Sequence, residues 1–121
     1  MARILVAEDE QAVRTFVTRA LEAAGHSVVG VADGGEAYAH LQTEPCDLLL
    51  TDIVMPVMDG IELALSAATL YPDMPILLMT GYAREKERAH NLESLIADII
   101  SKPFSLAELQ TIVASVLDPE K

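Results

Sequence analysis

The residues best suited to chemistry follow short apolar runs. They are Glu8 and Asp9 after one run, Asp52 after a second, Thr80 at the end of a third, and Lys102 after a fourth. Carboxylates held close together raise one another's pKa values unless a cation lies among them, and Mg²⁺ prefers such hard oxygen ligands. A divalent metal site is therefore expected. With the metal in place, the Lys102 ammonium would help to neutralise phosphoryl oxygens, as phosphoryl transfer requires.

The apolar runs have the length and composition of strands buried on both faces. They are rich in Ile, Leu and Val and are mostly unbroken by polar alternation. Five strands are predicted, over residues 3–7, 28–32, 47–51, 75–80 and 98–101.

Segments with helical periodicity separate these strands. The first of these segments ends at Gly25. Asp33 and Asp59 occupy N-cap positions, and each has a glutamate three residues later. Ser105 and Glu108 form an S-x-x-E capping box. The predicted helices cover residues 13–24, 34–42, 60–71, 84–96 and 106–117.

Strands that alternate with helices indicate the three-layer α/β class, with a parallel sheet between helices. Ligands of such sheets bind outside the carboxyl ends of the strands, where the candidate residues would converge. Each has a structural alternative: Asp9 could cap the first helix, and Lys102 could be a surface lysine. Together they favour a site, because five such groups rarely coincide at the ends of four strands. Asp59 is left out, since capping explains it.

Composition bounds the function. The 121 residues carry a net charge of −11, 51% are hydrophobic, and Cys46 is the single cysteine. So acidic a chain repels nucleic acid and anionic lipid, and it lacks a signal-peptide core or an apolar run of membrane-spanning length. We expect a cytoplasmic protein with one domain over residues 1–121, no output domain, and neither nucleic-acid nor membrane partners.

Four motifs together resemble the receiver domain of two-component response regulators. They are Glu8-Asp9; Thr51-Asp52-Ile53-Val54-Met55-Pro56 with Asp59-Gly60; Met79-Thr80-Gly81; and Lys102-Pro103-Phe104. The resemblance covers essentially the whole chain. It implies a flavodoxin-like sandwich of five helices and a five-stranded parallel sheet in the order 2-1-3-4-5.

The resemblance also implies roles for individual residues. Asp52 would accept a phosphoryl group from a phosphohistidine, and Lys102 would pair with that group. Thr80 and the Gly81 amide would hydrogen-bond the phosphoryl oxygens, and the Lys102–Pro103 peptide bond would be cis. The implied Mg²⁺ ligands are Glu8, Asp9, Asp52 and the backbone carbonyl of Val54.

The partners implied are a histidine kinase or histidine phosphotransfer protein, and an output protein that binds the fourth helix, fifth strand and last helix. The pattern resembles CpdR-type single-domain regulators of alphaproteobacteria, which implies an unphosphorylated adaptor for a ClpXP-type protease. A phosphate shuttle or sink, or a kinase regulator, is the alternative. Ile99 stands where family members often carry an aromatic residue, and Tyr82 is a candidate substitute.

No enzymatic activity is expected beyond self-phosphorylation and slow autodephosphorylation. A Mg²⁺-dependent aspartyl-phosphate phosphatase of the haloacid-dehalogenase type is a weaker alternative. Its chemistry requires D-x-D after the first strand, where this chain has Glu8-Asp9-Glu10. A flavodoxin-like FMN carrier needs a hydroxyl-rich loop at that place, and carboxylates there would repel its phosphate.

Overall fold

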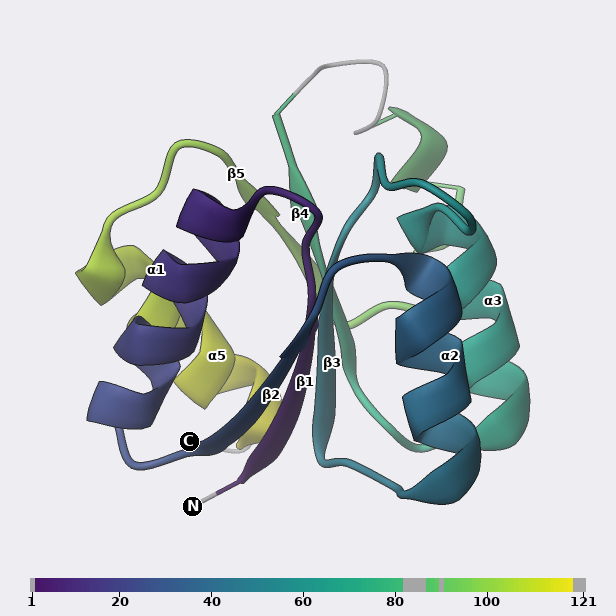
Figure 1. Cartoon of the computed structure of the whole chain (residues 1–121), viewed down its shortest axis with the longest axis horizontal. Coiled ribbons are helices and arrows are strands. Elements are labelled where there is room, and N and C mark those ends of the chain that lie inside the picture. The colour runs from purple at the N-terminus through teal and green to yellow at the C-terminus, as the bar shows by residue number, and fades with distance from the viewer. Residues whose placement is uncertain (1, 82–86, 90, 119–121) are drawn as a thin grey trace.

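Five parallel strands form one sheet at the centre of the computed structural model (Figure 1). The structure describes residues 2–81, 87–89 and 91–118. The strand order is β2-β1-β3-β4-β5, which confirms the predicted α/β class and topology. The elements in chain order are β1 (Arg3–Ala7), α1 (Gln11–Ala23), β2 (Ser27–Val31), α2 (Gly34–Thr43), β3 (Leu48–Asp52), α3 (Gly60–Leu70), β4 (Ile76–Thr80), β5 (Asp98–Ser101) and α5 (Leu106–Leu117).

The helices cover both faces of the sheet, with α1 and α5 on one side and α2 and α3 on the other (Figure 1). Successive residues of a strand point to opposite faces, so each central strand contributes to two cores. In β1, Ile4 and Val6 join the core under α1 and α5, whereas Leu5 and Ala7 join the core under α2 and α3. Burial on both faces makes β1, β3 and β4 rigid supports for the side chains at their carboxyl ends.

Side-chain caps begin three of the helices, as the sequence predicts. Asp33 accepts a hydrogen bond from the Glu36 amide at 2.8 Å, and Asp59 accepts one from the Glu62 amide at 2.9 Å. Ser105 forms the reciprocal capping box at the start of α5. Each cap satisfies a helical N–H group that would otherwise lack an acceptor.

Two predictions about these elements need correction. The outer strands β2 and β5 are not buried on both faces, because each lies at an edge of the sheet and its residues are mostly exposed or half-buried. The predicted helix over residues 84–96 is helical at residues 87–89, but residues 91–95 form turns. The Leu92 and Leu95 amides there donate to carbonyls three residues back, an arrangement tighter than an α-helix. The remainder of that segment falls outside the described residues.

Bilayer-spanning helices are absent from the described part of the chain, where no helix is both long and apolar enough.

Candidate functional site

Three charged side chains converge at the carboxyl edge of the sheet. The Lys102 ammonium donates to Glu8 Oε1 at 2.7 Å and to Asp52 Oδ2 at 3.0 Å, so it bridges residues that follow β1 and end β3. Glu8 is fully buried and Asp52 is 7% exposed. Two buried carboxylates therefore share one cation.

Both carboxylates are also held by backbone amides. Asp52 Oδ1 accepts from the Ile53 amide at 2.9 Å, and Glu8 Oε2 accepts from the Glu10 amide at 3.2 Å. Although burial lowers the pKa of Lys102, the hydrogen bonds and charges of Glu8 and Asp52 outweigh it and raise that pKa above its ordinary value. The lysine therefore stays protonated at neutral pH.

Asp9 completes the acidic cluster from a more exposed position. Burial raises its pKa, and the neighbouring Glu8 carboxylate raises it further. Carboxylate oxygens of Glu8, Asp9 and Asp52 lie within 4.8 Å of one another, and one such oxygen from each residue could face a single ion. This all-oxygen donor set fits a hard divalent cation. Asp9 does not cap α1, whose N-cap residue is Glu10.

The remaining predicted residues lie around this cluster. Val54, 53% exposed, and Gly81 line an open pocket of about 690 Å³ together with Glu8, Asp9, Asp52 and Lys102. Thr80 ends β4 but is not one of the residues that line this pocket; its side chain is buried, and its carbonyl accepts the Lys102 amide at 2.7 Å.

Two further expectations concern the elements that flank the site. The Lys102–Pro103 peptide bond is cis, as predicted. Ile99 is half-buried and packs against the core under α2 and α3, where it occupies the position of the expected aromatic side chain. Tyr82, the candidate substitute, lies outside the described residues.

Helix α3 begins directly behind Asp52, an approach that depends on Gly60. The Gly60 amide donates to the Ile53 carbonyl at 2.7 Å, and a Cβ atom at Gly60 would lie 2.0 Å from the Asp52 carbonyl oxygen. In the sequence, Gly60 belongs to the Asp59-Gly60 motif, which does not by itself indicate this close approach to Asp52. The preceding residue is a structural cap, as expected: although burial raises the pKa of Asp59, hydrogen bonds from the Glu62 amide and Arg88 lower it below its ordinary value.

Arg14, in the first turn of α1, also contacts the site and was missed by the sequence analysis. Its Nη1 donates to the Glu8 carbonyl at 2.7 Å. Its side-chain stem lies over Gly30, where a Cβ atom would be 3.3 Å from Arg14 Cγ. A glycine inside a strand often marks such a close approach, so Gly30 is the sequence signal that could have located this contact.

The arrangement of these residues matches a known protein family. The model of the response regulator receiver domain matches residues 4–114. The chain belongs to the response regulator receiver family. Phosphorylation of an aspartate is the general function of receivers, and in this receiver Asp52 is the acidic residue at the end of the third strand.

Relatives of this receiver include both short and longer regulators. It is 45% identical to the response regulator receiver protein CpdR of Brucella abortus, over 97% of this chain and 98% of that protein. It is 34% identical to the alkaline phosphatase synthesis transcriptional regulatory protein PhoP of Bacillus subtilis, over 95% of this chain but 48% of the relative. The receiver therefore covers nearly the whole length of CpdR but only about half the length of PhoP.

Solved structures agree with the receiver fold. The chemotaxis response regulator CheY4 of Vibrio cholerae superposes with a TM-score of 0.88 at 30% identity, covering 96% of this chain and 98% of CheY4. NtrX of Brucella abortus superposes with a TM-score of 0.90 at 25% identity, covering 98% of this chain and 28% of NtrX.

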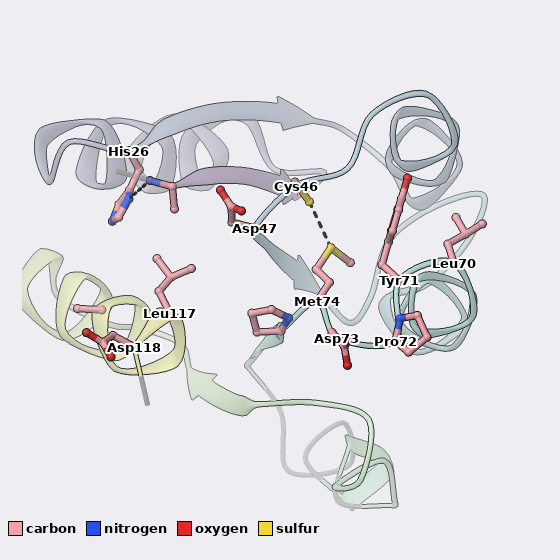
Figure 2. A pocket seen from close by; sticks show the side chains of 13 residues that line it. His26, Cys46, Asp47, Leu70, Tyr71, Pro72, Asp73, Met74, Leu117 and Asp118 are labelled. Atoms are coloured by element: carbon pink, nitrogen blue, oxygen red, sulfur yellow. Dashed lines mark hydrogen bonds between the residues drawn. The ribbon is translucent and has the colours of Figure 1, made fainter. Parts of the chain in front are cut away.

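A larger pocket, of about 930 Å³, is drawn in Figure 2. Its lining includes the residues directly before β1, β2, β3 and β4, so it lies at the amino ends of the strands, opposite the acidic cluster. His26, Cys46, Tyr71 and Met74 are among its lining residues, and none of the predicted site residues is. The Cys46 thiol donates to Met74 Sδ at 3.4 Å, and burial raises its pKa, which disfavours the reactive thiolate. We therefore assign the receiver's chemistry to the smaller pocket at the carboxyl edge.

Proposed function

We propose that this receiver accepts a phosphoryl group on Asp52 from a phosphohistidine of a histidine kinase or histidine phosphotransfer protein. The observation that supports this most is the bridge from the Lys102 ammonium to Asp52 Oδ2 at 3.0 Å and Glu8 Oε1 at 2.7 Å. It puts a nearly buried carboxylate beside a cation and next to an open pocket. A group that carries negative phosphoryl oxygens needs such a place.

In the proposed step, Asp52 Oδ2 attacks the phosphorus atom of the donor. A P–O bond forms while the P–N bond to the histidine breaks, and the imidazole nitrogen leaves with the electron pair of that bond. Oδ1 is held by the Ile53 amide at 2.9 Å, which fixes the carboxylate plane during the attack. The Lys102 ammonium neutralises charge on the transferred group, and Thr80 and the Gly81 amide are the proposed hydrogen-bond donors to its other oxygens.

The cation proposed for the acidic cluster is Mg²⁺, held by Glu8, Asp9, Asp52 and the Val54 carbonyl. When bound, it supplies charge neutralisation and orientation to the phosphoryl oxygens. We propose no catalysis of other substrates, and slow autodephosphorylation would end the signal.

Transfer from a phosphorylated histidine phosphotransfer domain tests this function. In Mg²⁺, the wild-type chain is expected to gain one alkali-labile phosphoryl group while the donor loses one. Asp52→Asn, which keeps the shape of the side chain but lacks the nucleophilic carboxylate, should gain none. Equal labelling of the two proteins on a gel would contradict the assignment of Asp52.

A second proposal concerns the output: we propose that the unphosphorylated receiver is an adaptor for a ClpXP-type protease in the cytoplasm. The 45% identity to CpdR along nearly the whole of both chains supports this role. The described surface offers a place for a partner: Ile100, Ala107, Thr111 and Ile112 contribute to a groove of about 530 Å³ between β5 and α5. A phosphate shuttle or sink, or regulation of a kinase, remains the alternative role.

Affinity capture separates the adaptor from the alternatives. Immobilised Asp52→Ala, which cannot be phosphorylated, is expected to retain a AAA+ protease component, and the wild type should release it after phosphorylation. The matched control is Asp52→Ala with Thr111→Arg, which places a large charge in the β5 and α5 groove. Retention of a histidine phosphotransfer protein without any AAA+ component would contradict the adaptor role and favour a shuttle.

A further inference from the structure

Arg14 lies near the start of α1, four residues after the N-cap residue Glu10. Its amide donates to the Glu10 carbonyl at 2.9 Å, so it belongs to the first hydrogen-bonded turn of the helix. Glu10 makes no side-chain capping bond. The contacts of the Arg14 side chain therefore decide what it does at this end of the helix.

The contacts of Arg14 connect it to the acidic cluster through the backbone. Its guanidinium donates to the Glu8 carbonyl, a backbone atom, at 2.7 Å. The Glu8 amide donates to the Val31 carbonyl at 3.0 Å, and the Glu10 amide donates to Glu8 Oε2 at 3.2 Å. The turn from β1 to α1 is thus held at the Glu8 amide, carbonyl and carboxylate.

The position of the guanidinium is set by packing as well as by its hydrogen bond. A Cβ atom at Gly30 would lie 3.3 Å from Arg14 Cγ and 3.3 Å from Thr18 Oγ1, closer than most Cβ contacts. Because Gly30 in β2 has no side chain, the aliphatic part of the Arg14 side chain can pack directly on the strand. A stem confined in this way loses little further entropy when its head group binds the carbonyl.

The acidic turn needs such support because its carboxylates repel one another. Oxygens of Glu8, Asp9 and Asp52 lie within 4.8 Å of each other, and like charges this close disfavour the arrangement of the turn. The Arg14 guanidinium supports that arrangement from the Glu8 carbonyl and leaves the carboxylate oxygens available.

We infer that Arg14 is a positioning residue for the cation site: it holds the turn that carries Glu8 and Asp9 in a geometry that binds Mg²⁺. This inference deepens the proposed function and rests on its assignment of Mg²⁺. Partners that orient metal ligands typically contribute 10- to 100-fold to metal affinity, so loss of the guanidinium should raise the Kd for Mg²⁺ by about 10-fold.

The test measures Mg²⁺ binding by calorimetry without a phosphoryl donor, and the free energy of unfolding in EDTA. Arg14→Met keeps a stem that covers Gly30 but removes the donor, and we expect its Kd to rise about 10-fold. Arg14→Lys should recover part of the loss, because an ammonium can reach the same carbonyl. The matched control is Arg19→Met, which removes an exposed arginine from the same helix and should bind Mg²⁺ as the wild type does.

A lower unfolding free energy of Arg14→Met with an unchanged Kd would show a purely structural role and overturn the inference. If Arg14→Met does not fold, Arg14→Gln replaces it: the shorter side chain lacks the guanidinium that binds the Glu8 carbonyl, and an unchanged Kd would again overturn the inference. A wild type that binds Mg²⁺ with Arg14-dependent affinity but takes up no phosphoryl group would support the inference and overturn the proposed function.

Discussion

Lys102→Met is expected to destabilise the Mg²⁺-free protein by about 2 to 3 kcal/mol, because it leaves buried charge without a partner. Glu8 is fully buried and accepts from the Lys102 ammonium at 2.7 Å. The estimate lies below the 3 to 5 kcal/mol typical of a broken buried pair, since Lys102 is 24% exposed and water reaches part of the site.

Mg²⁺ should reverse much of this loss. A divalent cation among the carboxylates takes over the neutralising charge, so saturating Mg²⁺ is expected to stabilise Lys102→Met more than the wild type. Urea unfolding of both proteins in EDTA and in Mg²⁺ measures the difference. The double variant Lys102→Met with Glu8→Gln separates lost charge from lost packing: it should be more stable in EDTA than Lys102→Met alone, because it lacks the fully buried one of the two orphaned charges.

The contribution of Lys102 to the free energy of unfolding depends on pH in a defined direction. The folded-state pKa of Lys102 is raised, so its stabilising effect is fully present below the ordinary value of 10.5 and is lost as the pH rises through the folded-state pKa. Equal stability of wild type and Lys102→Met in EDTA at neutral pH would contradict the account of the bridge. The variant should still bind Mg²⁺ but respond weakly to phosphorylation.

Gly60→Ala should destabilise the receiver by about 3 kcal/mol, the upper part of the range for overpacked sites. Its Cβ would lie 2.0 Å from the Asp52 carbonyl oxygen and 2.9 Å from Ile53 Cα. Both atoms belong to the backbone, so neither can rotate away as a flexible side chain would. The start of α3 must therefore move away from the end of β3 that carries Asp52.

Gly81→Ala is the matched control, because it makes the same change where there is room. Among the described residues, the nearest atom to its Cβ would be Lys102 Cβ at 4.0 Å, an ordinary contact. Its unfolding free energy should stay within about 1 kcal/mol of the wild type. Urea unfolding midpoints compare the two variants, and a Gly60→Ala protein as stable as Gly81→Ala would contradict the close packing of α3 on the acceptor strand.

The elements were predictable where local chemistry determines them. Asp33, Asp59 and Ser105 begin helices because each accepts a hydrogen bond from an amide three residues on, which depends on nearby sequence alone. Burial of whole strands was less predictable. The apolar runs of β2 and β5 resemble those of the central strands, but their edge positions, which leave them exposed, follow from long-range pairing.

The site was predictable to the extent that strand ends determine it. Parallel strands bring their carboxyl ends to one edge, so the meeting of Glu8, Asp52 and Lys102 followed from their places in the sequence. The direct bridge between Lys102 and Glu8 did not, because it depends on side-chain reach across the two strands that lie between β1 and β5. The role of Arg14 was not predictable for a similar reason. Its contact with the Glu8 carbonyl depends on packing against Gly30, which lies in β2, the strand paired with β1.

The most direct test of the central claim is to locate the phosphoryl group in the wild-type chain. The protein is incubated with acetyl phosphate and Mg²⁺, reduced with borohydride, digested and analysed by mass spectrometry. Hydride reduces an acyl phosphate to the alcohol, so a phosphorylated aspartate is recorded as homoserine. We predict homoserine at position 52, and none in Asp52→Asn or when EDTA replaces Mg²⁺. Homoserine at another aspartate, or an unmodified wild-type chain, would contradict the account.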